Sequence, residues 1–117
     1  MNHRIPVLAI MTCVTAAGQL AGASFDKDVL PLLDASCLDC HNADEQKGGL
    51  DLSKFTSEAA VMKDRAVWRS VYEKIESHQM PPPKRKSQPT ADERKKVMDW
   101  IMEIAARPDP VLGARDP

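Results

Sequence analysis

The sequence predicts an all-α fold of about three helices joined by long loops. Apolar residues recur every three or four positions in three separate segments, which is the spacing of an amphipathic helix. No segment shows the sustained alternation of apolar and polar residues that is typical of a half-buried strand. The chain has 117 residues, which is enough for one domain and too few for two.

The first 23 residues have the pattern of a secretory signal peptide. Arg4 gives a basic start, residues 5–17 form an apolar run, and Ala21-Gly22-Ala23 is a small-x-small cleavage sequence. The run is shorter than the roughly 20 residues that span a membrane. We therefore expect cleavage after Ala23 and a periplasmic or secreted protein with no stable membrane insertion. An N-terminus that is kept as an anchor is the alternative.

The rest of the chain is expected to form one domain over residues 24–107. Residues 24–36 have helical spacing, and a first helix is expected that either starts near Asp28, with Pro31 in its first turn, or is kinked at Pro31. Residues 42–55 are expected to form a loop, because Gly48-Gly49 permits a tight turn. The tail, residues 108–117, has no periodicity and is expected to be disordered.

Two further helices are expected in the second half of the domain. Residues 65–77 repeat apolar positions every four residues, and Asp64 before them is an expected N-cap. Thr90 and Glu93 have the spacing of a capping box, which predicts the start of the last helix. Arg107-Pro108 is expected to end it.

Composition narrows the functional class. The formal net charge is −1, so no overall charge bias indicates a nucleic-acid partner. Aromatic residues make up only 4% of the chain, which is thin for the core of a small domain. Small domains often need a staple or a cofactor to complete their core.

The motif that carries chemistry is Cys37-Leu38-Asp39-Cys40-His41. This C-x-x-C-H pattern is the attachment signature of haem c. Two thiols one helical turn apart can each add to a vinyl group of the same porphyrin. The following histidine, His41, is then held where its imidazole can reach the iron.

Three other readings of the cysteine pair are less consistent with the sequence. A structural zinc site needs four ligands, and the exported chain has one cysteine pair and two histidines. A thioredoxin-like site would follow a strand in a βαβ pattern, which is missing here. A simple disulfide between Cys37 and Cys40 would leave His41 unexplained.

The ordered motifs resemble those of class I cytochromes c, and most closely the planctomycete-type cytochrome c domain of exported bacterial proteins. The resemblance runs from about Phe25 to Ala106. In chain order it is carried by Val29-x-Pro31-x-Leu33, the haem motif, Lys47-Gly48-Gly49-Leu50-x-Leu52, Gln79-Met80-Pro81-Pro82-Pro83, Gln88-Pro89, and Glu93 followed by Trp100-Ile101.

The resemblance implies a small class I cytochrome c-like fold wrapped round one covalent haem. Its first and last helices would cross beside the haem. Cys37 and Cys40 would be thioether-linked, His41 would be the proximal iron ligand and Met80 the distal one. The short stretch between the Gly-Gly turn and the second helix departs from the family pattern, which leaves that side of the haem pocket undefined.

The residues themselves leave two main candidates for the sixth iron position. Met80 precedes Pro81, which pushes it off the helix into an extended conformation, and the three prolines would then stiffen the backbone. His78 is the second choice, although it is also explained as a residue at a helix end. Met62 is a minor candidate, and Met98 and Met102 are better explained by packing on the last helix.

Several other residues have two readings each. Trp68, Arg69 and Tyr72 offer donors for the haem propionates, but Trp68 and Tyr72 also suit the core. Trp100 is expected to pack between the terminal helices. The basic runs 84–86 and 94–96 are either ordinary solvated positions or a positive surface that attracts an acidic redox partner.

The predicted function is that of an exported monohaem c-type cytochrome, a one-electron carrier and not an enzyme. Its one cofactor is haem c, with iron held by His41 and Met80, and its partners are redox proteins. One alternative is a haem enzyme or gas-binding domain with an open or labile sixth site. The other is an electron-transfer subunit of a larger exported enzyme.

Overall fold

The computed structural model describes residues 22–108, and in that range its regular elements are all helices, with no strand. The all-α prediction is confirmed. Its elements are η1 (Phe25–Val29), α1 (Leu30–Ser36), η2 (Lys47–Gly49), α2 (Glu58–Lys63), α3 (Arg65–Glu76) and α4 (Ala91–Ala106). Most of the expected signal peptide and tail lies outside the described residues.

The first helical segment begins at Phe25, before Asp28, and its hydrogen-bond pattern changes just before Pro31. Ser24 caps it by accepting a hydrogen bond from the Lys27 amide at 3.2 Å. The first five residues, η1, form a π-helical turn in which the Leu30 N–H bonds to the Phe25 carbonyl. Pro31 has no N–H to donate and sits in the first turn of α1. A wider turn before the proline lets the two segments follow one another.

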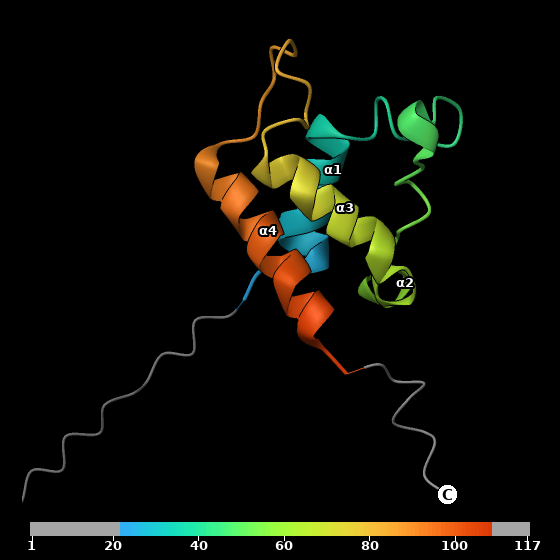
Figure 1. Cartoon of the computed structure of the whole chain (residues 1–117), viewed down its shortest axis with the longest axis vertical. Helices are drawn as coiled ribbons and strands as arrows, with labels where there is room; N and C mark the ends of the chain where they lie inside the picture. The colour runs from blue at the N-terminus through green and yellow to red at the C-terminus, as the bar shows by residue number, and fades with distance from the viewer. Residues whose placement is uncertain (1–21, 109–117) are drawn as a thin grey trace, which may run out of the picture.

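The segment between α1 and α3 is mostly loop, and Figure 1 shows it extending to one side of the helices. The predicted tight turn is present, because Gly48 and Gly49 have φ angles of 67° and 72°. Glycine adopts such left-handed angles at little cost. The turn contains the short 3₁₀ segment η2.

The helix α2 was not predicted, so the described chain has four α-helices and not three. Ser57 caps it by accepting a hydrogen bond from Ala60 at 3.2 Å, and Val61 is its buried residue. Six residues are too few to show helical periodicity. Met62 lies in this helix. Asp64 precedes α3 as expected, but its side chain makes no capping hydrogen bond.

The last helix, α4, begins with the predicted capping box. Thr90 accepts a hydrogen bond from the Glu93 amide at 3.1 Å, and the Glu93 carboxylate accepts one from the Thr90 amide at 2.7 Å. The helix ends before Arg107, whose backbone is extended. Its buried face consists of Val97, Trp100, Ile101 and Ile104.

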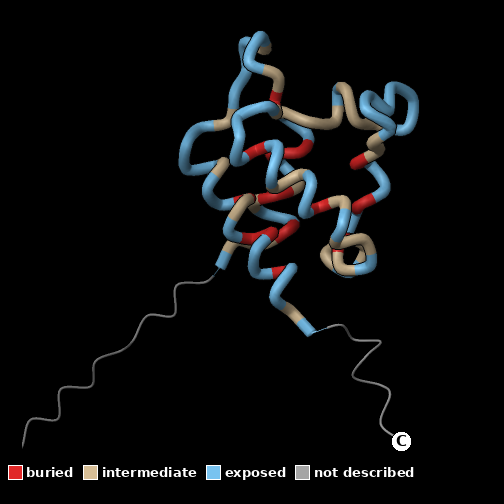
Figure 2. The backbone as a smooth tube through the Cα atoms, viewed as in Figure 1, coloured by how far each residue is buried: buried red, intermediate tan, exposed pale blue. Residues whose placement is uncertain are grey.

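Four aromatic residues connect the helices across the core. Trp100 packs between Phe25 of η1 and Trp68 of α3, with ring centroids 5.5 and 5.6 Å apart. Phe55 meets the other side of Trp68 at 5.4 Å, edge to face. Figure 2 shows the buried segments gathered where the helices meet, with the long loops largely exposed. Trp100 thus packs against the first helix, as expected.

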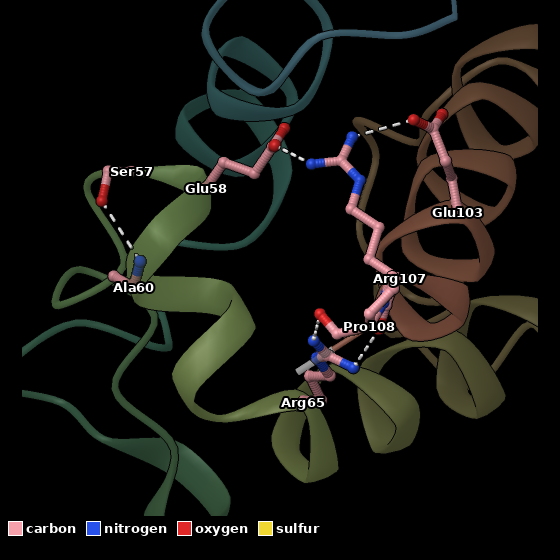
Figure 3. A network of polar contacts seen from close by, with 7 residues as sticks. All are labelled: Ser57, Glu58, Ala60, Arg65, Glu103, Arg107 and Pro108. Atoms are coloured by element: carbon pink, nitrogen blue, oxygen red, sulfur yellow. Dashed lines mark hydrogen bonds and ion pairs between the residues drawn. The ribbon is translucent and has the colours of Figure 1, made fainter. Parts of the chain in front are cut away.

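Arg107 joins the end of α4 to α2 (Figure 3). Its guanidinium pairs with Glu58 of α2 and, at 2.8 Å, with Glu103 one turn earlier in α4. Its carbonyl accepts a hydrogen bond from Arg65 of α3 at 2.7 Å. Three helices are thereby held together at this end of the domain. Within residues 22–108, no helix is both long enough and apolar enough to cross a membrane.

Candidate functional site

A cavity of about 790 Å³ lies among α1, the loop after it, α3 and the loop between α3 and α4. This size falls within the roughly 300–1,000 Å³ of small-molecule and cofactor sites. The apolar part of its lining consists of Leu32, Leu50, Leu52, Val67, Val71, Ile75, Pro81, Pro82 and Pro89. All four residues of the predicted iron and haem site, namely Cys37, Cys40, His41 and Met80, also line it.

The haem motif forms one turn directly after α1. The Cys40 and His41 amides both donate to the Cys37 carbonyl, at 3.2 and 3.1 Å. This turn lets the two thiols and the imidazole line the same cavity. The Leu52 amide donates to the His41 carbonyl at 2.8 Å, which ties the far end of the loop back to the motif.

Arg85 from the proline loop contacts the motif directly. Its guanidinium donates to the Asp39 carboxylate at 2.9 Å and to the Cys40 sulfur at 3.2 Å. Burial raises the pKa of the Cys37 thiol to about 11, and the positive charge of Arg85 offsets part of that rise. Cys37 is therefore a neutral thiol near pH 7 in the chain without haem.

Met80 reaches the cavity from the loop that follows α3. Its amide donates to the Lys74 carbonyl at 3.0 Å, so its backbone stays attached to the end of the helix. The proline stretch after Met80 was expected to be extended. The structure differs, because part of this stretch forms a turn. The Arg85 amide donates to the Pro82 carbonyl at 2.9 Å, which closes a turn over residues 82–85. Proline suits this turn because its φ angle is already set.

His78 lies outside the cavity lining and is exposed. Its φ angle is +57°, and its amide donates to the Ile75 carbonyl while that of Gln79 donates to the Lys74 carbonyl. These two bonds define a Schellman motif in which His78 takes the left-handed position after the helix. His78 therefore lies at the end of α3, as the helix-end interpretation predicted.

The other methionines lie away from the cavity. Met62 and Met98 are half-buried beside the core, and Met102 is 55% exposed. None of the three is part of the cavity lining. Among the methionines of residues 22–108, Met80 is thus the one that lines the same cavity as His41.

The residues proposed for the haem propionates do not line the cavity either. Trp68 is a core residue, and its indole nitrogen has no hydrogen-bond partner among the described residues. Arg69 is exposed, and the Tyr72 hydroxyl contacts Glu76 at 3.5 Å. The cationic residues that do line the cavity are Lys47, Lys74, Arg85 and Arg94. Arg85 and Arg94 belong to the two basic runs, but their spacing did not indicate that they face inward.

The site fits haem c on three observations. Both cysteines are free thiols at the cavity wall and are not joined in a disulfide. The His41 ring has a buried Nδ1 and no hydrogen bond to another described residue, so it is available as a ligand. The cavity has a mostly apolar wall with a few cationic residues, which suits a porphyrin with two propionates. Elsewhere in residues 22–108, no group of three His, Cys, Asp or Glu side chains could hold a metal ion.

Comparison with known proteins supports the family. No curated protein and no solved structure matches the chain. Residues 37–84 match the family model described as Planctomycete cytochrome C. This range begins at the first cysteine of the haem motif and ends just after the three prolines. The resemblance seen in the sequence is therefore confirmed over residues 37–84, which are similar to planctomycete cytochrome c domains.

Proposed function

We propose that this protein is an exported monohaem c-type cytochrome that carries single electrons between redox proteins. Cys37 and Cys40 would bind the haem covalently, and His41 and Met80 would hold its iron. The observation that carries the proposal is that all four side chains line one cavity with a mostly apolar wall. Export is supported by the signal-peptide pattern of residues 1–23.

Bound haem supplies an iron centre that gains or loses one electron. The chain would contribute two iron ligands from separate segments, His41 from the motif turn and Met80 from the loop after α3. A thioether distal ligand opposite histidine raises the reduction potential. With both axial positions filled by protein, no position would be left for a substrate, which favours a carrier over an enzyme.

The cavity wall supports the same reading. A haem enzyme needs polar distal groups to activate a bound ligand. The histidine that could serve in this way, His78, is exposed and does not line the cavity. Apolar residues from α3, including Val67 and Val71, line it instead. A mostly apolar wall of this kind would limit the access of water to bound haem, which suits electron transfer.

An optical experiment tests the proposal. The purified exported protein is expected to show low-spin c-type haem in both oxidation states, with a weak methionine-to-iron band when oxidised. Cyanide and carbon monoxide should bind slowly and weakly. A high-spin spectrum that shifts at once on adding either ligand would refute the carrier assignment in favour of an open sixth site.

Mass spectrometry tests the remaining parts of the proposal. The mature protein is expected to begin at Ser24 and to carry the mass of one haem after denaturation. An intact N-terminus would indicate that the segment is kept as an anchor. Haem that dissociates on denaturation would refute the thioether bonds at Cys37 and Cys40.

A further inference from the structure

The backbone of Met80 is held on both sides by helices. Its amide donates to the Lys74 carbonyl of α3 at 3.0 Å. Its carbonyl accepts a hydrogen bond from the Arg94 guanidinium of α4, also at 3.0 Å. Both polar backbone groups of this residue are therefore satisfied by elements outside its own loop.

Arg94 also organises the rest of the loop. The nitrogen that contacts Met80 lies 3.5 Å from the Ile75 carbonyl, and the second terminal nitrogen donates to the Gln88 side-chain oxygen at 2.9 Å. The Gln88 amide nitrogen in turn donates to the carbonyls of Pro82 and Arg85, at 2.9 and 3.1 Å. One guanidinium thus connects the end of α3, Met80 and, through Gln88, the turn that follows.

The first turn of α4, which carries Arg94, is well anchored. Arg94 lies in the first turn of α4, and its amide donates to the carbonyl of Thr90 in the capping box. The same helix is packed on α3 through Trp68 and Trp100. Arg94 is half-buried and lines the cavity. A planar guanidinium has several donors in a fixed fork and can bridge several carbonyls, which a lysine ammonium does less well.

We propose that Arg94 is the positioning residue of the distal ligand, which sets how readily Met80 leaves the iron. This inference rests on the proposed function, in which Met80 is that ligand. Arg94 does not touch the iron in this scheme; it acts by restricting the backbone of Met80. Restriction matters because an ordered loop loses little conformational entropy when a weak ligand binds.

The test is a titration of oxidised holoprotein with imidazole, which competes with Met80 for the iron. The association constant of imidazole is expected to rise about 10- to 100-fold in Arg94→Met, as the loss of a charge-assisted hydrogen bond implies. Arg94→Lys should give an intermediate constant, because it keeps the charge but not the bridge to Gln88. Gln88→Ala should shift the constant in the same direction by a smaller factor.

Two matched variants separate positioning from general effects. Lys95→Met removes the same charge from the neighbouring position, where the side chain pairs with Asp99 and with no other residue of the range 22–108. Arg107→Met weakens the helix contacts at the far end of the domain, away from the cavity. Both are expected to keep the wild-type imidazole constant, even where unfolding by denaturant shows a loss of stability.

The outcomes divide cleanly. A wild-type protein with no methionine-to-iron band overturns the proposed function and this inference together. If the band is present and Arg94→Met binds imidazole as the wild type does, only the inference fails. If Arg94→Met does not yield folded holoprotein, Arg94→Lys and Gln88→Ala decide, and unchanged constants in both overturn it. An equal rise in Lys95→Met or Arg107→Met would also overturn it.

Discussion

Met80 and His78 lie two positions apart, yet the fold gives them different surroundings. The helix end turns at His78, whose left-handed backbone faces its side chain to solvent, whereas Met80 reaches the cavity wall. The Schellman bonds at the end of α3 make this separation. A difference in backbone conformation, and not in chemistry alone, favours the thioether as the distal ligand.

Replacing Met80 by Ala should therefore abolish the methionine-to-iron band and lower the reduction potential. The shift would be a part of the roughly 0.8 V range over which axial ligands set haem potentials. Optical spectra and redox titration measure both effects. His78→Gly is the matched control and should leave the band and the potential unchanged. An unaltered band in Met80→Ala would move the assignment to another methionine, first of all Met62, whereas low-spin haem without this band in the wild type would move it to His78.

The thiol of Cys37 provides a test that depends on pH. Its pKa is raised from 9.0 to about 11 in the folded chain, chiefly by burial. Thiolate is the nucleophilic form, so near pH 8 haem-free Cys37 should be alkylated about 100-fold more slowly than in the urea-unfolded chain. The difference should shrink as the pH rises towards 11.

Replacing Arg85 tests whether its charge affects the reactivity of Cys37 in the same experiment. Its positive charge lowers the Cys37 pKa, so Arg85→Met should slow the alkylation of Cys37 further. Peptide mapping by mass spectrometry separates Cys37 from Cys40. Equal rates for Cys37 in the folded and unfolded chains would contradict the burial of this thiol.

Among the helices, α4 has the best-defined beginning. The capping box of Thr90 and Glu93 satisfies two backbone amides that would otherwise lack partners. Thr90→Ala should lower the free energy of unfolding by about 1 kcal/mol, as the loss of an N-cap typically does. Denaturant titration of the holoprotein measures the change.

The control for this prediction is Thr90→Ser, which keeps the hydroxyl and should retain most of the wild-type stability. Because Arg94 lies in the same first turn, fraying of α4 in Thr90→Ala should also raise imidazole binding modestly. A fully stable Thr90→Ala variant would show that the packing of α4 on α3 alone holds this end of the helix.

Across the whole molecule, positive charge gathers around the cavity although the net charge is only −1. Lys47 and Lys74 line it, and the exposed side chains of Lys84 and Lys86 belong to the loop that carries Met80. A local field of one sign attracts oppositely charged reactants and is screened by salt. We propose that this rim attracts an acidic redox partner.

The double variant Lys84→Glu, Lys86→Glu should slow oxidation of the reduced protein by ferricyanide several-fold at low ionic strength. The dependence on salt should weaken as well, because less attraction is left to screen. Stopped-flow absorbance measures the rate. The control is the double variant Lys27→Glu, Lys63→Glu, which changes the net charge equally at positions that do not line the cavity. If this variant slows the oxidation equally, the effect comes from the overall charge of the protein and not from the rim.

The features that local sequence rules could predict are those confined to one turn of chain. The capping box at Thr90 depends on residues three positions apart, and the Gly48-Gly49 turn on two adjacent ones. The haem motif spans five residues. In each case the physical cause, a hydrogen bond or an allowed φ angle, is complete within the segment itself. The helix α2 escaped prediction because six residues are too few to display a period.

The sequence by itself determined the helical class, the haem motif and the resemblance to planctomycete-type cytochromes c, since each rests on short patterns that can be read along the chain. Only the tertiary structure decided which cations face the cavity and what holds the distal loop. Arg94 contacts Met80 across 14 positions and Arg85 contacts Asp39 across 46. Such contacts exist because the packing of α4 on α3 and the course of the proline loop bring distant residues together, and no spacing in the sequence records that packing.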